Sequence, residues 1–265
     1  MNGSSLERNP FPASIPVVFL HGAGITSWMW QDLISGLPWM EAFTPDYGTF
    51  QPDFTIEHTA HDLLRQLQQR FQGRRVHLVG HSLGGAVTLK MLELAPERFL
   101  SVVVSGSTVL PMGSMALLFP VMEWSLPLNQ TPMMLALAAR AMQVPPHHRA
   151  AFFKDQKSMT KKAFRQIMKE ASNFRLSEGL KTCTVPVLAV AGSKEVEVNR
   201  KSAKAIQQHL PQALGGEISG GHHVWFAQKP QLFREVLEHW FRTKEVLSNP
   251  EIRPLSGNPG RLSLE

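Results

Sequence analysis

One short stretch limits, more than any other feature, what this chain can fold into. Residues 80–85 (GHSLGG) follow an apolar run at 75–79 and precede an apolar stretch with helical spacing at 84–94. The run is typical of a strand buried on both faces. A serine between glycines at a strand-to-helix junction indicates a sharp turn that strains the serine backbone and projects its hydroxyl. We therefore expect Ser82 to be a nucleophile at the end of a central strand.

Similar apolar runs alternate with helical patterns along the chain. Runs rich in Val and Leu occur at 15–20, 100–105 and 186–191, each followed within two residues by a glycine, and weaker strand patterns occur at 42–45 and 216–219. Helical spacing of apolar residues occurs at 55–71, 199–209 and 231–241. This alternation predicts an α/β fold with a mostly parallel sheet of about six strands flanked by helices.

The alternation stops at residues 107–183, which show no strand pattern and hold eight of the twelve methionines. Residues 132–142 (PMMLALAARAM) predict a helix with proline in its first turn. Because the segment is too long for a simple connection, we expect a helical lid (cap) over the edge of the sheet where such folds bind ligands. Its methionines either fill helix cores or form an adaptable apolar wall over a pocket.

These patterns divide the chain into three parts. Residues 1–106 and 184–242 are expected to form the core, and residues 107–183 the inserted lid. Residues 243–265 are rich in Pro, Gly, Ser and charge, which is typical of a mobile tail.

The serine turn and its surroundings resemble the α/β-hydrolase superfamily, in its group of lid-bearing serine hydrolases and esterases. The resemblance extends over about residues 15–240. Gly80, His81 and Gly84 support the turn, and the glycines leave room where a Cβ would collide. The resemblance implies the α/β-hydrolase fold and a carboxylesterase-like enzyme with a small-molecule substrate and neither metal nor cofactor. Family members often begin with an antiparallel strand pair, which we expect to be missing because only 14 residues precede the first predicted strand.

A second matching motif follows the first predicted strand, where His21 and Gly22 precede Ala23. In the family, the residue after His-Gly donates a backbone N–H to the oxyanion of the reaction. The resemblance therefore implies an oxyanion hole made by the N–H groups of Ala23 and Leu83. Two fixed donors aimed at one oxygen stabilise a tetrahedral oxyanion by several kcal/mol.

A third motif is a Gly-Gly-His-His loop at residues 220–223. The family carries a Gly-His loop here, often with proline seven residues after the catalytic histidine. That spacing fits His223 and Pro230, whereas His222 is the alternative because it follows the glycine directly. An imidazole suits a base that works near neutral pH. Four histidines outside the motifs are expected at the surface: His58, His61, His147 and His148.

The scarcity of aspartate constrains the third catalytic group. The family usually has a Gly-x-x-Asp motif directly after the strand that is predicted at 186–191. This chain has Glu195 at the position of the aspartate. The chain holds five aspartates, and only Asp155, in the insert, follows Ser82. A glutamate can still hold the histidine tautomer and stabilise the imidazolium. We expect Glu195 in this role, with Glu197 as the rival and the lack of any such acid as the third possibility.

Composition excludes several other classes of protein. The single cysteine, Cys183, rules out an internal disulfide and a Cys-rich zinc site. No apolar run is long enough to span a membrane, and residues 1–10 lack the pattern of a secretory signal, which favours the cytoplasm. The net charge is +6, and residues 140–204 hold 14 Lys and Arg against five Asp and Glu. Because the chain shows no nucleic-acid motif, we interpret this excess of positive charge as solvated helix faces. The alternative is a surface for nucleic acid, anionic lipid or an acidic substrate.

The function favoured by these motifs is hydrolysis of an ester-type bond in a small or medium apolar substrate through an acyl-enzyme. Hydrolysis of a carbon–carbon bond, a lyase reaction and perhydrolysis would use the same residues. A non-catalytic ligand-binding or signalling protein on the same scaffold is the alternative from another class, supported by the glutamate in place of aspartate. The sequence makes no prediction of oligomeric state.

Overall fold

The computed structural model describes residues 14–256, which form one sheet covered by helices. The strands are β1 (Ile15–Leu20), β2 (Met40–Phe43), β3 (Val76–His81), β4 (Phe99–Ser105), β5 (Val187–Gly192), β6 (Ala213–Ile218) and β7 (Ile252–Pro254). The helices that cover the sheet are α1 (Gln31–Ser35), α2 (Ile56–Phe71), α3 (Leu83–Leu94), α8 (Glu197–His209), α9 (Trp225–Gln228) and α10 (Pro230–Thr243).

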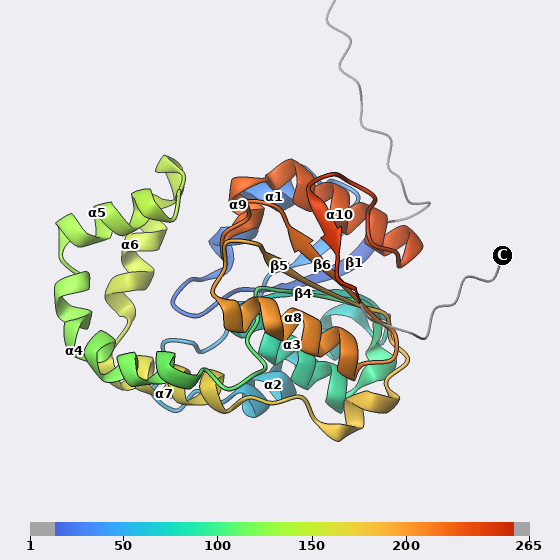
Figure 1. Ribbon diagram of the computed structural model, residues 1–265, viewed down its shortest axis with the longest axis horizontal. Coiled ribbons are helices and arrows are strands. Elements are labelled where there is room, and N and C mark those ends of the chain that lie inside the picture. The colour runs from blue at the N-terminus through green and yellow to red at the C-terminus, as the bar shows by residue number, and fades with distance from the viewer. Residues whose placement is uncertain (1–13, 257–265) are drawn as a thin grey trace, which may run out of the picture.

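The strands lie in the order β2-β1-β3-β4-β5-β6-β7, and neighbours are parallel except for the pair β6 and β7. Helices α2, α3 and α8 lie on one face of the sheet, and α1, α9 and α10 lie on the other (Figure 1). The expected α/β fold with a mostly parallel sheet flanked by helices is confirmed. Parallel strands end at a common edge, and this edge carries the residues discussed below.

Alternate residues of the central strands build two separate cores. In β4, Val102 and Val104 pack among the residues of α2 and α3, whereas Val103 packs among those of α10 on the opposite face. All three are fully or almost fully buried. Strands covered on both faces need apolar side chains at every position, which is why these runs could be predicted from composition.

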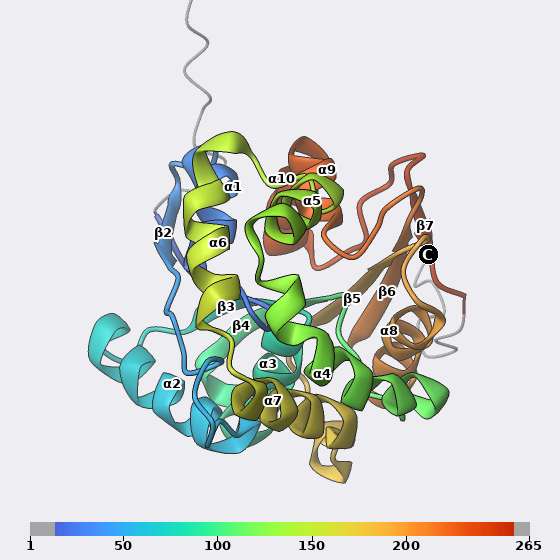
Figure 2. The same ribbon diagram turned by 90° about the vertical axis from the view of Figure 1, so that its left-hand side faces the viewer.

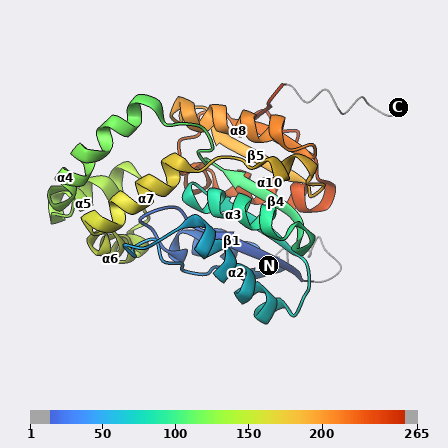
Figure 3. The ribbon, with the colours of Figure 1, turned by 90° about the horizontal axis from the view of Figure 1, so that it is seen from below.

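The insert, residues 107–183, contains helices and no strand. Its helices are α4 (Phe119–Asn129), α5 (Pro132–Ala141), α6 (Arg149–Ser158) and α7 (Lys161–Asn173), with short 3-10 helices that include Pro146–His148. They lie beside the sheet rather than on its two covered faces, and in the turned view they lie in front of the edge of the sheet (Figures 2 and 3). None of the helices described in residues 14–256 is both long and apolar enough to cross a membrane.

The structure differs from expectation at the C-terminal end. The segment expected as a mobile tail from residue 243 instead contains β7, so the sheet formed by residues 14–256 has seven strands rather than about six. A turn at Asn249, whose carbonyl accepts from the N–H of Ile252, returns the chain antiparallel to β6. Only Ile252 of this strand is buried, so the polar composition of the segment did not predict a strand. Residues 257–265 of the expected tail lie outside the described residues.

Candidate active site

Ser82 lies at the turn between β3 and α3. Its backbone has φ +54° and ψ −120°, a conformation that costs a non-glycine residue on the order of 1–3 kcal/mol and is found mostly at functional sites. A Cβ on Gly80 would come 2.5 Å from the carbonyl oxygen of Gly84, and a Cβ on Gly84 would come 2.5 Å from the carbonyl oxygen of His21. Gly80 therefore allows the turn to close on itself, and Gly84 allows it to pack against the end of β1.

A chain of hydrogen bonds connects Ser82 with a histidine and a carboxylate. Nε2 of His223 lies 3.1 Å from Oγ of Ser82, and Nδ1 of His223 lies 2.8 Å from Oε2 of Glu195. With its proton on Nδ1, the imidazole donates to Glu195 and accepts from the serine hydroxyl. The three side chains come from three different loops at the carboxyl edge of the sheet. This arrangement can take the proton of the serine hydroxyl.

Glu195 is buried, and both of its oxygens have hydrogen-bond donors besides His223. The backbone N–H of Gly192 donates to Oε1 at 2.9 Å, and Nδ2 of Asn199 donates to Oε2 at 2.8 Å. Asn199, in the first turns of α8, is in turn held by Thr108, whose hydroxyl donates to its Oδ1. Sequence reasoning missed Asn199. The signal that could have found it is its position four residues after Glu195, at the start of a helix.

The two rival residues lie differently. Glu197 begins α8 at the surface, where its carboxylate pairs with Lys201 at 2.8 Å; that hydrogen bond holds the pKa of Glu197 below its usual range. The side chain of His222 is exposed, and its backbone N–H donates to Gln228. The structure thus brings Glu195 and His223 to Ser82, and it shows no hydrogen bond from Glu197 or His222 to them within residues 14–256.

Two buried histidines pack beneath the site. The ring of His81 lies 4.6 Å from the ring of His223, and burial, reinforced by the charge of His223, lowers the pKa of His81 well below 6.5. His21 stacks on Tyr47 at 4.1 Å, and burial lowers its pKa as well. The hydroxyl of Tyr47 donates to the carbonyl of His21. Both imidazoles are therefore neutral packing groups near pH 7, and His223 is the imidazole that contacts the serine hydroxyl.

The loop after β1 borders the serine. A Cβ on Gly22 would lie 3.3 Å from Cβ of Ser82, so the loop passes directly beside the nucleophile. Ala23 and Leu83 line a small cavity of about 90 Å³ together with Ser82. Leu83 is the first residue of α3, and its N–H therefore has no acceptor within the helix. Ala23 and Leu83 therefore border the same small space beside Ser82.

The insert is fixed to this loop by buried polar contacts that the sequence did not reveal. Oδ2 of Asp155, on α6, accepts hydrogen bonds from the N–H and hydroxyl of Thr26 and from the indole of Trp28, all at 2.7–2.9 Å. The side chain of Gln156 donates to the carbonyl of Gly24 at 2.6 Å. The only aspartate after Ser82 thus anchors the insert and does not approach His223.

Methionines of the insert line the space above Ser82. A cavity of about 330 Å³ is bordered by Ser82 and His223 on one side and by α4, α6 and α7 on the other. The methionines along it are Met122, Met142, Met159 and Met168. A larger open cleft of about 710 Å³ continues past Glu195 and adds Met112 and Met115. Six of the eight insert methionines therefore border the serine cavities, which favours the apolar wall over the helix-core interpretation.

His148 corrects an expectation. It was expected at the surface with His147, but only 8% of it is exposed, because its ring packs against Trp28 with ring centres 5.3 Å apart. The side chain of His147 is 61% exposed, as expected.

The comparisons with known proteins agree with this fold. The model of the alpha/beta hydrolase family matches residues 17–236, whereas no curated protein matches the chain. An esterase from Exiguobacterium antarcticum has a TM-score of 0.74 at 18% identity, over 87% of this chain and 93% of the esterase. A putative lipase from Acinetobacter baumannii has a TM-score of 0.73 at 17% identity, over 87% and 84% of the two chains.

A third similar structure is a carboxylesterase structure from the thaumarchaeon Nitrososphaera gargenis, with a TM-score of 0.70 at 17% identity, over 87% and 91% of the two chains. At such identities these structures show a common fold and nothing about substrate. The family match covers most of the chain, including the serine turn and the loop of His223. The chain therefore belongs to the alpha/beta hydrolase family.

Proposed function

We propose that this protein is a serine hydrolase that cleaves an ester-type bond through an acyl-enzyme intermediate. The observation that carries the proposal is the continuous hydrogen-bonded chain from Ser82 through His223 to Glu195, on a serine whose backbone is strained. Nucleophile, base and orienting carboxylate in this order are the parts that acyl transfer requires. Esterases are among the proteins that share this fold, so an ester is the first bond to test.

The proposed reaction has two halves. His223 takes the proton of Ser82 as its oxygen attacks the carbonyl carbon, and the N–H groups of Ala23 and Leu83 donate to the oxyanion that forms. The imidazolium then protonates the leaving alcohol, and the acyl group remains on Ser82. In the second half, His223 takes a proton from water, which attacks the acyl-enzyme. The imidazolium then returns the proton to Oγ of Ser82 as the bond to the acyl group breaks and the acid leaves. Glu195 remains ionised and stabilises the imidazolium in both halves.

The cavity above Ser82 suggests the kind of substrate. Its lining is mostly apolar and contains flexible methionine side chains from the insert. We propose that the insert acts as a lid, and that one apolar acyl or alcohol group of small or medium size lies against these methionines.

A panel of p-nitrophenyl esters with acyl chains of increasing length tests the proposal. We expect hydrolysis by the wild-type protein and a loss of at least about 10⁴-fold in kcat/KM for Ser82→Ala, because the remaining site stabilises charge without a nucleophile. Ser35→Ala, an exposed serine of α1, is the matched control and should retain full activity. Hydrolysis by Ser82→Ala at the wild-type rate would refute the role of Ser82. A folded wild-type protein that cleaves none of the esters would refute the choice of bond.

A further inference from the structure

A second group of polar side chains lies where the insert meets the core, apart from the serine site. Asp32 belongs to α1, and His147 and His148 belong to the 3-10 helix Pro146–His148 of the insert. Nε2 of His147 lies 3.1 Å and 3.0 Å from the two oxygens of Asp32, and Nε2 of His148 lies 3.2 Å from Oδ1. The cluster could not be predicted from the sequence, because Asp32 precedes His147 by 115 positions.

The buried member of the cluster, His148, meets Asp32 in a close but poorly aligned contact. His148 is 8% exposed, and its Nε2 has no hydrogen bond to any of the described residues although it points at Asp32. The approach of 3.2 Å is close enough for an ion pair but not aligned as a hydrogen bond. A buried ring nitrogen whose one partner is poorly aligned is satisfied better by a ligand that lies on its lone pair.

The surrounding structure holds the cluster in place before anything binds. Pro145 and Pro146 restrict the backbone ahead of the two histidines, and the N–H of His148 closes the turn on the carbonyl of Pro145 at 2.9 Å. The ring of His148 packs on Trp28, whose indole is itself fixed by Asp155. The ligand atoms are therefore already held close together, and binding of an ion does not have to order a mobile loop first.

The distances agree with shared coordination of a metal ion. Bonds of 2.0–2.1 Å at tetrahedral angles separate neighbouring ligand atoms by about 3.3 Å. The separations between Asp32 and the two histidines are 3.0–3.2 Å, and all three ligand atoms lie within 4.8 Å of one another. The remaining gap between the two imidazole nitrogens closes by rotation of His147, whose side chain is mostly exposed.

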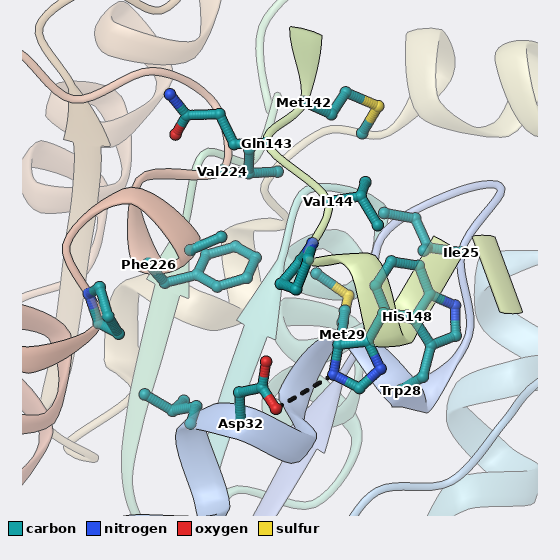
Figure 4. A pocket seen from close by; sticks show the side chains of 14 residues that line it. Ile25, Trp28, Met29, Asp32, Met142, Gln143, Val144, His148, Val224 and Phe226 are labelled. Atoms are coloured by element: carbon teal, nitrogen blue, oxygen red, sulfur yellow. Dashed lines mark ion pairs between the residues drawn. The ribbon is translucent and has the colours of Figure 1, made fainter. Parts of the chain in front are cut away.

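We propose that Asp32, His147 and His148 bind a divalent transition-metal ion of the zinc type. Two imidazoles and one carboxylate form a donor set that suits zinc, and a fourth position would take water or a ligand. Asp32 and His148 also border a mostly apolar cavity of about 260 Å³, shown in Figure 4, where the carboxylate of Asp32 faces His148. The ion joins α1 of the core to the insert at the mouth of this cavity. The site does not depend on the proposed reaction at Ser82.

The test is calorimetric titration of zinc chloride into tag-free protein that has first been treated with a chelator and then freed of it. We expect one saturable site, with affinity at least about tenfold weaker in Asp32→Asn and in His147→Asn, because each removes one ligand. Both residues are exposed, so these variants are expected to fold. His58→Gln is the matched control, because His58 also lies beside an aspartate, Asp62 at 3.3 Å, but without a third ligand.

Thermal unfolding provides a second measurement. Zinc should raise the unfolding midpoint of the wild-type protein and of His58→Gln, and should raise that of Asp32→Asn less. This difference separates a metal site from a plain His–Asp ion pair, which Asp32→Asn would weaken equally with and without zinc. The proposal is overturned if the wild-type protein shows no saturable binding below millimolar zinc. Equal binding by wild type, Asp32→Asn and His147→Asn would also overturn it, because the ion would then lie elsewhere.

Discussion

Glu195 stands where the family usually has aspartate, and the surrounding residues fit its extra methylene. Its side chain is fully buried, with the N–H of Gly192 on one oxygen and Asn199 and His223 on the other. A carboxylate with several donors is held in one orientation. The geometry thus provides a carboxylate partner for His223 in a chain that has no suitable aspartate.

Replacing Glu195 by Gln tests this partner. The amide keeps the shape but loses the charge that stabilises the imidazolium, so we expect kcat/KM for an ester substrate to fall by on the order of 10²–10⁴. Glu197→Gln, a surface residue two positions away, should change the rate less than about threefold. Steady-state kinetics on both variants decide the matter. A loss below tenfold for Glu195→Gln would remove Glu195 from the mechanism.

His77 makes the stability of the fold depend on pH. Burial, together with the charges of Lys244 and Arg75, lowers the pKa of His77 to about 3. In the unfolded chain the same group titrates near 6.5. Below pH 6.5 the unfolded state therefore binds a proton that the folded state does not, and the free energy of unfolding falls by up to about 1.4 kcal/mol per pH unit.

The prediction is a shallower pH dependence for His77→Gln, measured by urea unfolding between pH 7 and pH 5. Glutamine can still bond the hydroxyl of Ser101, the partner of the imidazole at 2.8 Å, but it takes up no proton. At pH 5, the free energy of unfolding should change with pH more steeply for the wild-type protein than for the variant. The difference in slope should correspond to the uptake of close to one proton on unfolding. Exposed His58→Gln should keep the wild-type slope. Identical slopes for wild type and His77→Gln would show that His77 is not held neutral.

At the scale of elements, α6 is attached to the core through Asp155. Three donors from the loop after β1 converge on one carboxylate oxygen, and the residue is 5% exposed. The same loop carries Ala23, so the anchor that holds the insert also holds a wall of the serine site.

Asp155→Ala should therefore affect both stability and catalysis. The change leaves buried donors unsatisfied, and we expect a loss of roughly 3 kcal/mol in the free energy of unfolding. We also expect kcat/KM to fall at least about tenfold, because a small displacement of catalytic groups is costly. Lys157→Ala, an exposed neighbour on the same helix, is the control for both urea unfolding and kinetics. If Asp155→Ala is destabilised but keeps wild-type activity, the contacts of Asp155 stabilise the fold without positioning the serine site.

The sequence predicts the elements whose pattern is local and misses those that depend on distant partners. The run that forms β1 is apolar at nearly every position, and the pattern predicts its bounds. The strand β7 has one buried residue, Ile252, and its pairing with β6 could not be read from its own composition. Likewise, Ser82 and His223 stand in local motifs, whereas Asp155 acts on Thr26 from 129 positions away.

At the scale of the whole molecule, the parallel sheet explains how the site forms. Ser82 and His223 are separated by 141 positions, and Glu195 and His223 by 28, yet each follows a strand at the same edge. The insert enters the chain at that edge, between β4 and β5, and covers the serine with apolar side chains. The fold thus supplies both a fixed hydrogen-bonded chain and a cavity for a substrate beside it.

The most direct test of the central claim is covalent labelling by a fluorophosphonate, followed by intact-mass measurement and peptide mapping. An activated serine attacks the phosphorus atom and retains the phosphonyl group. We expect one adduct per wild-type chain on Ser82, no adduct on Ser82→Ala, and much slower labelling of His223→Ala. A folded wild-type protein that remains unlabelled, or that carries the adduct on another residue, would contradict the assignment of Ser82, His223 and Glu195 as a catalytic unit.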